Sequence, residues 1–146
     1  MKLKKKILSG VVLVLRSLET GRFLVVRELQ SKKGIKREGQ LSFPSETVFL
    51  GEDKESALKR TFIEEVGILP NDNLEYMGEL TWIDREDVRA DVSIYLSWIE
   101  EEFISRPKDA TDVAFHGWMS LDEILSHDIR LGMPETVFYL KKKITE

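Results

Sequence analysis

The sequence predicts a single α/β domain with a mixed β-sheet over residues 1–146. Residues 7–16 are rich in β-branched side chains and leucine, which is typical of a buried strand. Residues 88–98 alternate apolar and polar side chains with a period of two, which indicates a strand with one buried face and one more polar face. Residues 54–66 carry apolar side chains at helical spacing. Strands and helices therefore alternate along one chain.

The composition limits the classes of function. Hydrophobic residues make up 42% of the chain and charged residues 33%, as in ordinary globular proteins. The formal net charge of −4 argues against nucleic-acid binding, which favours basic domains. The absence of cysteine excludes disulfides, thiolate metal ligands and cysteine nucleophiles.

The first residues superficially resemble a signal peptide. The apolar run over residues 7–15 is short, however, and Ser9 and Gly10 interrupt it. It ends at Arg16 without a small-residue cleavage pattern, so a first strand is favoured. No segment is long enough to span a membrane, and we expect a cytoplasmic protein without a membrane partner.

A turn signal at residues 19–21 predicts that residues 22–29 form a hairpin with the first strand. Residues 30–40 then form a polar loop, which is either a solvated hairpin tip or a site that attracts phosphate oxygens. The cationic residues of this loop are Lys32, Lys33, Lys36 and Arg37.

Short apolar pieces within residues 40–50 lead into the predicted helix at residues 54–66. Asp53 is a suitable N-cap, Gly67 stands where a left-handed C-terminal residue belongs, and Pro70 follows the end. The buried side of this helix is expected to carry Ala57, Leu58, Phe62 and Val66.

The second half of the chain predicts three strands and two helices. The expected elements are strands at 74–83 and 88–98 around an acidic turn at 84–87, a strand at 113–119, a helix capped by Ser120, and a terminal helix from Pro134 to about Lys143.

Thr61, Glu64 and Glu65 stand at positions i, i+3 and i+4 of the predicted helix, so their Cβ atoms lie on one face, about 5–6 Å apart. Two adjacent carboxylates repel each other unless a positive charge lies between them. The face therefore either binds a divalent cation or is a solvated acidic surface.

The stretch Glu46–Ile68 resembles the Nudix box, G-x5-E-x7-R-E-U-x-E-E-x-G-U, in which U is a bulky apolar residue. Residues 41–44 resemble the segment that precedes this box in the family, and residues 117–121 resemble its late strand and short helix. The resemblance implies a Nudix-like α/β/α sandwich with a mixed β-sheet. Seven of the nine specified positions match, namely Glu52, Arg60, Phe62, Glu64, Glu65, Gly67 and Ile68.

The resemblance also implies a chemistry, the hydrolysis of a nucleoside diphosphate linked to another moiety with Mg²⁺ or Mn²⁺. A hard cation with oxygen ligands neutralises phosphoryl groups and polarises the attacking water. By resemblance, Glu64 and Glu65 are catalytic metal ligands, and Glu52 joins the metal shell or its supporting ion pairs. Arg60 pairs with a carboxylate of the box and holds it in place, and Glu46 offers its backbone carbonyl to the metal.

The sequence departs from the box at two positions. Glu46 replaces a glycine, so a Cβ restricts the backbone there. Thr61 replaces a glutamate and cannot act as a general base at neutral pH. A Nudix-fold ligand-binding or regulatory protein with weak or lost hydrolase activity is therefore the alternative function. Later residues that could supply the base are Glu100, Glu101, Glu102, Asp109, Asp112 and His116.

Further features concern the ligand and the oligomeric state. Ile63 lies on the otherwise polar side of the helix, which suggests a possible homodimer. A related isomerase chemistry relies on a cysteine and is not expected here. The aromatic residues that either stack on a nucleotide base or pack in the core are Trp82, Tyr95, Trp98 and Trp118.

Overall fold

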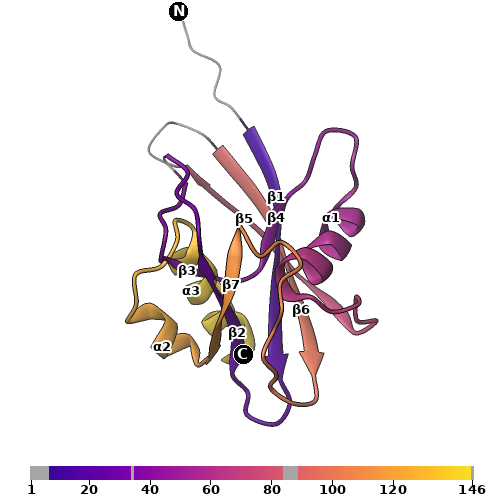
Figure 1. Ribbon diagram of the computed structural model, residues 1–146, viewed down its shortest axis with the longest axis vertical. Helices are drawn as coiled ribbons and strands as arrows, with labels where there is room; N and C mark the ends of the chain where they lie inside the picture. Colours follow the sequence, from indigo (N-terminus) through magenta and orange to yellow (C-terminus); the bar gives the residue numbers. More distant parts are fainter. Residues whose placement is uncertain (1–6, 34, 84–88, 146) are drawn as a thin grey trace, which may run out of the picture.

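The computed structural model describes residues 7–33, 35–83 and 89–145 (Figure 1). Its strands are β1 (Ile7–Ser17), β2 (Phe23–Glu28), β3 (Leu41–Ser42), β4 (Ser45–Thr47), β5 (Leu74–Ile83), β6 (Arg89–Ile99) and β7 (Val113–Met119). Its helices are α1 (Lys54–Arg60), the π-helix η1 (Thr61–Val66), α2 (Leu121–Leu125) and α3 (Met133–Thr145). The predicted acidic turn at residues 84–87 lies outside the described residues.

Strand β1 is the centre of a mixed sheet. It runs parallel to β6 along its whole length and antiparallel to β2 and β4. The pairing with β2 is confined to the hairpin end, at Arg16 and Phe23, while β4 pairs with the first half of β1 and sets Glu46 opposite Val11. The short strand β4 therefore carries the start of the predicted functional stretch against the middle of the sheet.

Both faces of β1 are buried, as expected for a central strand with a parallel neighbour. Val11, Leu13 and Leu15 pack in the layer formed with α1 and η1, whereas Val12 and Val14 pack in the layer formed with α3. Figure 1 shows α1 and α3 on opposite sides of the sheet. This arrangement confirms the predicted α/β/α sandwich.

The helix predicted over residues 54–66 is continuous but changes type. After Arg60 it continues as a π-helix, in which the Gly67 amide donates to the Phe62 carbonyl at 2.8 Å, five residues back. At the transition, the Thr61 hydroxyl donates to the Ala57 carbonyl at 2.9 Å. Apolar periodicity does not distinguish the two helix types, and π-helical turns frequently occur at functional sites.

The predicted cap residues of this helix are confirmed. The Asp53 carboxylate accepts a hydrogen bond from the Ser56 amide at 2.7 Å, and Gly67 ends the helix with φ 83°. The chain packs so closely there that a Cβ on Gly67 would overlap the backbone of Arg106, whose amide donates to Val66.

We expect Gly67→Ala to lower the free energy of unfolding by roughly 2–4 kcal/mol, because left-handed strain and a backbone clash act together. Gly51 is the matched control, since it has φ 82° and no atom within 4 Å of a built Cβ. Gly51→Ala should cost only about 1–2 kcal/mol, the strain alone. Urea denaturation measures both variants, and equal losses would show that the contact with Arg106 is unimportant.

One feature of β6 differs from the prediction. Val92, Ile94 and Leu96 are buried on one face as expected, but Ser93 and Ser97 on the opposite face are buried as well. The face is covered because residues of the α1 and η1 layer pack over this side of the sheet. A polar side chain in a period-two strand therefore did not mark a solvent-exposed face.

The C-terminal part follows the sequence signals. The hydroxyl of Ser120 and the carboxylate of Glu123 form a capping box at the start of α2. The terminal helix begins at Met133, one residue before the predicted Pro134. Within the described residues, no helix is both long and apolar enough to cross a membrane.

Candidate active site

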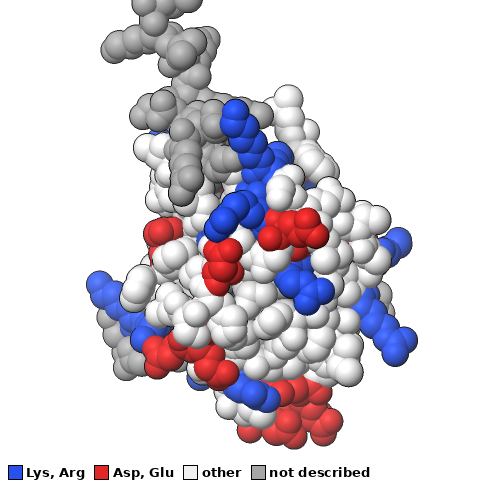
Figure 2. All heavy atoms as spheres, turned by 60° about the vertical axis from the view of Figure 1, so that its left-hand side comes forward, with Lys and Arg blue, Asp and Glu red and all other residues white. Residues whose placement is uncertain are grey.

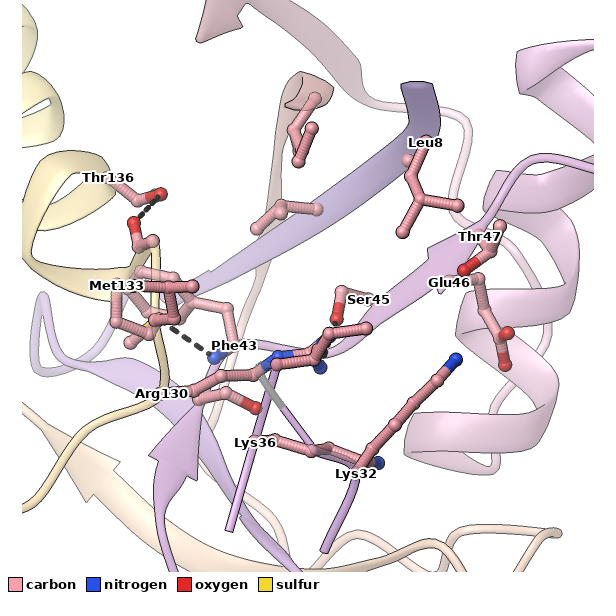
Figure 3. Close-up of a pocket in the computed structure, with 18 of the residues that line it drawn as sticks. Leu8, Lys32, Lys36, Phe43, Ser45, Glu46, Thr47, Arg130, Met133 and Thr136 are labelled. Carbon is pink, nitrogen blue, oxygen red and sulfur yellow. Dashed lines mark hydrogen bonds between the residues drawn. The ribbon is translucent and has the colours of Figure 1, made fainter. Parts of the chain in front are cut away.

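A cavity of about 390 Å³ lies between β1, the loop after β2, strands β3 and β4, and the segment before α3 (Figure 3). Phe43, Trp82 and Met133 contribute apolar surface to its lining, and Arg130 and Lys32 contribute positive charge. In Figure 3 the Lys32 side chain points toward Glu46. The cavity thus combines an apolar surface with cations beside the predicted acidic stretch.

Glu65 lies on η1 with only 2% of its surface exposed. The Ser45 amide donates to its Oε1 at 3.4 Å, but its Oε2 is buried without a hydrogen-bond partner among the described residues. Burial, together with the charges of Asp112 and Glu46, raises the pKa of Glu65 to about 9. A buried carboxyl oxygen without a partner is costly unless a cation or water satisfies it.

Arg60 gathers the other carboxylates of this region. Its Nη1 lies 3.2 Å from Glu46 Oε2 and 3.9 Å from Glu64 Oε2. Its Nε and Nη2 donate to the two oxygens of Glu52 at 2.9 and 2.8 Å. Burial and a hydrogen bond with Glu64 raise the pKa of Glu46 to about 7, whereas hydrogen bonds from Arg60 lower that of Glu52. Glu46 and Glu64 therefore meet at one guanidinium nitrogen.

These oxygen donors suit a hard divalent cation, but they do not form a finished cage. In the described part of the chain, no three Asp, Glu, His or Cys side chains are grouped closely enough to be recognised as a metal site. Glu65 nevertheless offers an unpartnered buried oxygen, and Glu46 and Glu64 stand close enough to repel each other. The residues present thus fit a divalent cation.

Thr61 makes its hydrogen bond in the core and not with these carboxylates. Its side chain is fully buried, and its hydroxyl is bonded to the Ala57 carbonyl. The predicted common face of Thr61, Glu64 and Glu65 is therefore divided, because Glu64 remains 39% exposed while the other two are buried.

A model of the NUDIX domain matches residues 7–140 of the sequence. The chain belongs to the NUDIX domain family. Membership confirms the predicted resemblance and the predicted enzyme class, a Nudix-type hydrolase. No curated protein matches the sequence.

Solved structures share the Nudix fold. The MutT protein from Methanosarcina mazei Go1 has a TM-score of 0.77 and 17% identity, over 99% of this chain and 100% of that one. The NUDIX domain of Shewanella oneidensis NrtR, complexed with ADP ribose, has a TM-score of 0.73 and 12% identity, over 98% of this chain and 90% of that one. A C. elegans Ap4A hydrolase has a TM-score of 0.64 and 15% identity, over 96% and 98%.

Of the six residues considered as a general base outside the Nudix box, Asp112 is the one that lines the cavity. Its Oδ1 lies 2.8 Å from Lys36 Nζ. The Asp109 amide donates to the Glu64 carbonyl, but the Asp109 carboxylate accepts hydrogen bonds from Thr111.

The other four candidates lie elsewhere. Glu102 pairs with Arg22, and the Glu100 carbonyl binds the Glu19 amide, so both belong to the hairpin end of β1. Glu101 between them is exposed, and His116 is an exposed residue whose ring meets that of His127 edge to face.

The structure also separates the four aromatic candidates. Tyr95 lies beside Tyr76, with ring centroids 5.4 Å apart. Trp82 lines the cavity, where its ring packs against Gly132. Trp118 is buried in the core and donates to the Phe103 carbonyl, and Trp98 packs with Arg16. Core packing is therefore the role of Trp118, and Trp82 is the one of these four candidates that lines the cavity.

The sequence did not single out Glu28 or Arg130, although both belong to the charge network at this cavity. Glu28 is 99% buried at the end of β2 and accepts from Lys36, Ser42 and Arg130. An acidic residue at the end of an apolar strand was the one local signal of this network. Nothing local marked Arg130, which reaches Glu28 only through the fold.

The cationic residues of the loop over residues 30–40 lie in different environments, so neither of the two predicted roles describes the whole loop. Lys36 is held in ion pairs with Glu28 and Asp112, and Lys32 lines the cavity. Arg37 is exposed and pairs with Asp128. Figure 2 shows basic and acidic side chains side by side near the centre of one face of the molecule, and a group of acidic side chains at its lower edge.

Proposed function

We propose that the protein is a metal-dependent pyrophosphohydrolase that cleaves a nucleoside diphosphate linked to another moiety. The observation that carries this proposal is the buried, unpartnered Oε2 of Glu65, next to the strand that bears Glu46. The neighbouring cavity offers cations for phosphate groups and an aromatic ring for a base. These are the features that such a substrate needs.

Glu46, Glu64 and Glu65 are the residues that would hold Mg²⁺ or Mn²⁺. When bound, the cation would neutralise phosphoryl charge and polarise a water molecule. The backbone of Glu46 pairs with Val11 in the sheet, while its carboxylate reaches Arg60. We therefore assign the role of Glu46 to its side chain, where the resemblance had suggested its carbonyl.

The remaining residues of the site orient these groups. Arg60, anchored by both oxygens of Glu52, keeps Glu46 and Glu64 together. Asp112 lines the cavity and is the best-placed proton acceptor outside the box, with Lys36 at 2.8 Å fixing its position. Glu52 thus supports the site through an ion pair.

A specific observation also favours the alternative, a Nudix-fold ligand-binding or regulatory protein. Thr61 is buried with its hydroxyl engaged, so helix η1 offers two carboxylates toward a metal, not three. The NrtR domain, which has a similar fold, was crystallised with ADP ribose. On this second proposal, a nucleotide derivative binds in the cavity and is not turned over.

One experiment separates the two functions. The protein is incubated with nucleotide sugars, dinucleoside polyphosphates, ADP-ribose, NADH and nucleoside triphosphates, with Mg²⁺ or Mn²⁺, and product release is followed. Turnover above that of a Glu65→Gln variant on any substrate supports the hydrolase. Saturable binding in calorimetry, without turnover on the whole panel, supports the ligand-binding protein.

Oligomeric state and location stay predictions. Ile63 has 36% of its surface exposed, which is compatible with a contact to a second copy. Sedimentation of the purified protein tests the homodimer. The cytoplasmic location and the lack of nucleic-acid binding rest on the composition of the sequence.

A further inference from the structure

A buried ionic cluster borders the cavity away from the acidic helix. Its centre is the carboxylate of Glu28, of which 1% is exposed. Oε2 of Glu28 accepts from Lys36 Nζ at 2.9 Å, and Oε1 accepts from Ser42 Oγ and Arg130 Nη1, both at 3.1 Å. Strand β2, the following loop, β3 and the segment before α3 each contribute one member.

Such a cluster needs an explanation other than stability. Removing charges from water is costly, and a well-packed apolar group is often at least as stabilising as a buried ion pair. A buried carboxylate does, however, fix the position of a cation. Here Glu28 holds Arg130, and Lys36 supplies the second positive charge that Glu28 and Asp112 share.

Arg130 presents its guanidinium to the cavity while it is held in this way. Its side chain is 27% exposed and is among the cavity residues drawn in Figure 3. Among the described residues, its side-chain hydrogen bonds to Glu28 and Ser45 both use Nη1. The planar group has donors on its other edge as well, which are suited to two oxygens of one phosphate.

Ser45 connects this arginine to the acidic helix. Its hydroxyl lies 3.4 Å from Arg130 Nη1, and its amide donates to Glu65 Oε1 at 3.4 Å. The guanidinium and the buried carboxylate are therefore separated by a single residue of β4. A diphosphate bound through a cation at Glu65 would therefore need to pass only this residue to bring its second phosphate to Arg130.

We propose that Arg130 binds a phosphate group of the ligand and that Glu28 is the positioning residue that holds its guanidinium. The inference rests on the proposed function for the identity of the ligand, a nucleoside diphosphate derivative. The opposing interpretation is a purely structural ion pair. In that case substitution changes stability and leaves ligand affinity alone.

The test compares ligand binding and stability across matched variants. ADP, ADP-ribose, inorganic pyrophosphate and adenosine are titrated calorimetrically into the wild type and into Arg130→Gln, Arg130→Lys and Glu28→Gln, with and without Mg²⁺. Arg37→Gln is the control, because Arg37 is 72% exposed and pairs with Asp128 outside the cluster. Thermal unfolding is followed in parallel for each protein.

We expect Arg130→Gln to weaken the binding of ADP and pyrophosphate by about tenfold or more, since a charge-assisted hydrogen bond is lost. Adenosine binding should not change. Glu28→Gln should weaken ADP binding too, and the double variant should be no weaker than Arg130→Gln alone, because the two residues act as one unit. Arg130→Lys keeps the charge but loses the planar pair of donors. Its affinity for ADP and pyrophosphate should lie between those of the wild type and Arg130→Gln.

Unchanged ADP and pyrophosphate affinity in Arg130→Gln, with only a lower Tm, would overturn the inference, as would failure of the wild type to bind any of the phosphate ligands. The outcome is separable from that of the proposed function. If ADP-ribose binds through Arg130 without turnover, the inference stands and the hydrolase proposal fails. If turnover proceeds in Arg130→Gln with the wild-type KM, the hydrolase stands and the inference fails.

Discussion

Glu65→Gln is expected to lower metal-dependent turnover by about 10²- to 10⁴-fold and at the same time to stabilise the metal-free protein. The loss of turnover follows because an amide is a poor ligand for a hard cation and cannot take up a proton. The gain in stability follows because burial makes the ionised form of Glu65 unfavourable in the folded protein. A change that abolishes activity without harming the fold is typical of a functional residue.

The pH dependence of stability has a definite sign. The pKa of Glu65 rises from 4.5 to about 9 on folding, and that of Glu46 rises to about 7. Above pH 4.5 the unfolded chain therefore loses protons that the folded chain keeps, so the free energy of unfolding falls as pH increases. The protein is most stable, as far as Glu65 is concerned, below the pKa of this group in the unfolded chain. This stabilisation is lost as the pH approaches 9.

Chemical denaturation in a chelator at about pH 5 and pH 8 measures this effect. We expect the wild type to lose on the order of a few kcal/mol over this interval, and Glu65→Gln to lose less. Saturating Mg²⁺ should reduce the loss in the wild type, because it stabilises the ionised form. Identical pH profiles for the two proteins would show that Glu65 is ionised in the folded state.

Local signals in the sequence were sufficient for most of the fold. Asp53 and Gly67 set the ends of the functional helix through cap hydrogen bonds to residues at most five positions away. The apolar run at residues 7–16 marked the central strand, because both of its faces are covered. The caps form between residues close in the chain, and burial on both faces leaves a continuous apolar run, so a sequence pattern records both features.

The rest of the site depends on pairings between distant segments. Arg130 lies 102 residues from its partner Glu28, so no spacing rule brings the two together. The π-helical turn begins at Thr61, whose hydroxyl bonds to the Ala57 carbonyl, a contact that an α-helical pattern equally allows. The sequence identified the acidic face through the Nudix box, but the cluster that borders the cavity appeared only in the folded chain.

Glu46→Gln is expected to weaken Mn²⁺ binding by about 10- to 100-fold or more, because loss of a proposed ligand should cost at least as much as loss of a group that only supports one. Glu46 and Glu64 meet at Arg60 Nη1, so removal of the Glu46 charge leaves this nitrogen to Glu64 alone and makes the site less negative. Electron paramagnetic resonance of free Mn²⁺ gives the affinity without requiring turnover. Glu55→Gln is the control, since Glu55 on α1 is 76% exposed and pairs only weakly with Lys59.

Thr61→Val completes this test, because the box glutamate is missing at that position. The Thr61 hydroxyl donates to the Ala57 carbonyl inside the core, so its loss should cost about 1 kcal/mol of stability and leave Mn²⁺ affinity unchanged. A loss of metal binding in Thr61→Val but not in Glu46→Gln would place the third ligand on the helix. The opposite result means that strand β4 supplies the carboxylate that the helix lacks, and that the two departures from the Nudix box compensate each other.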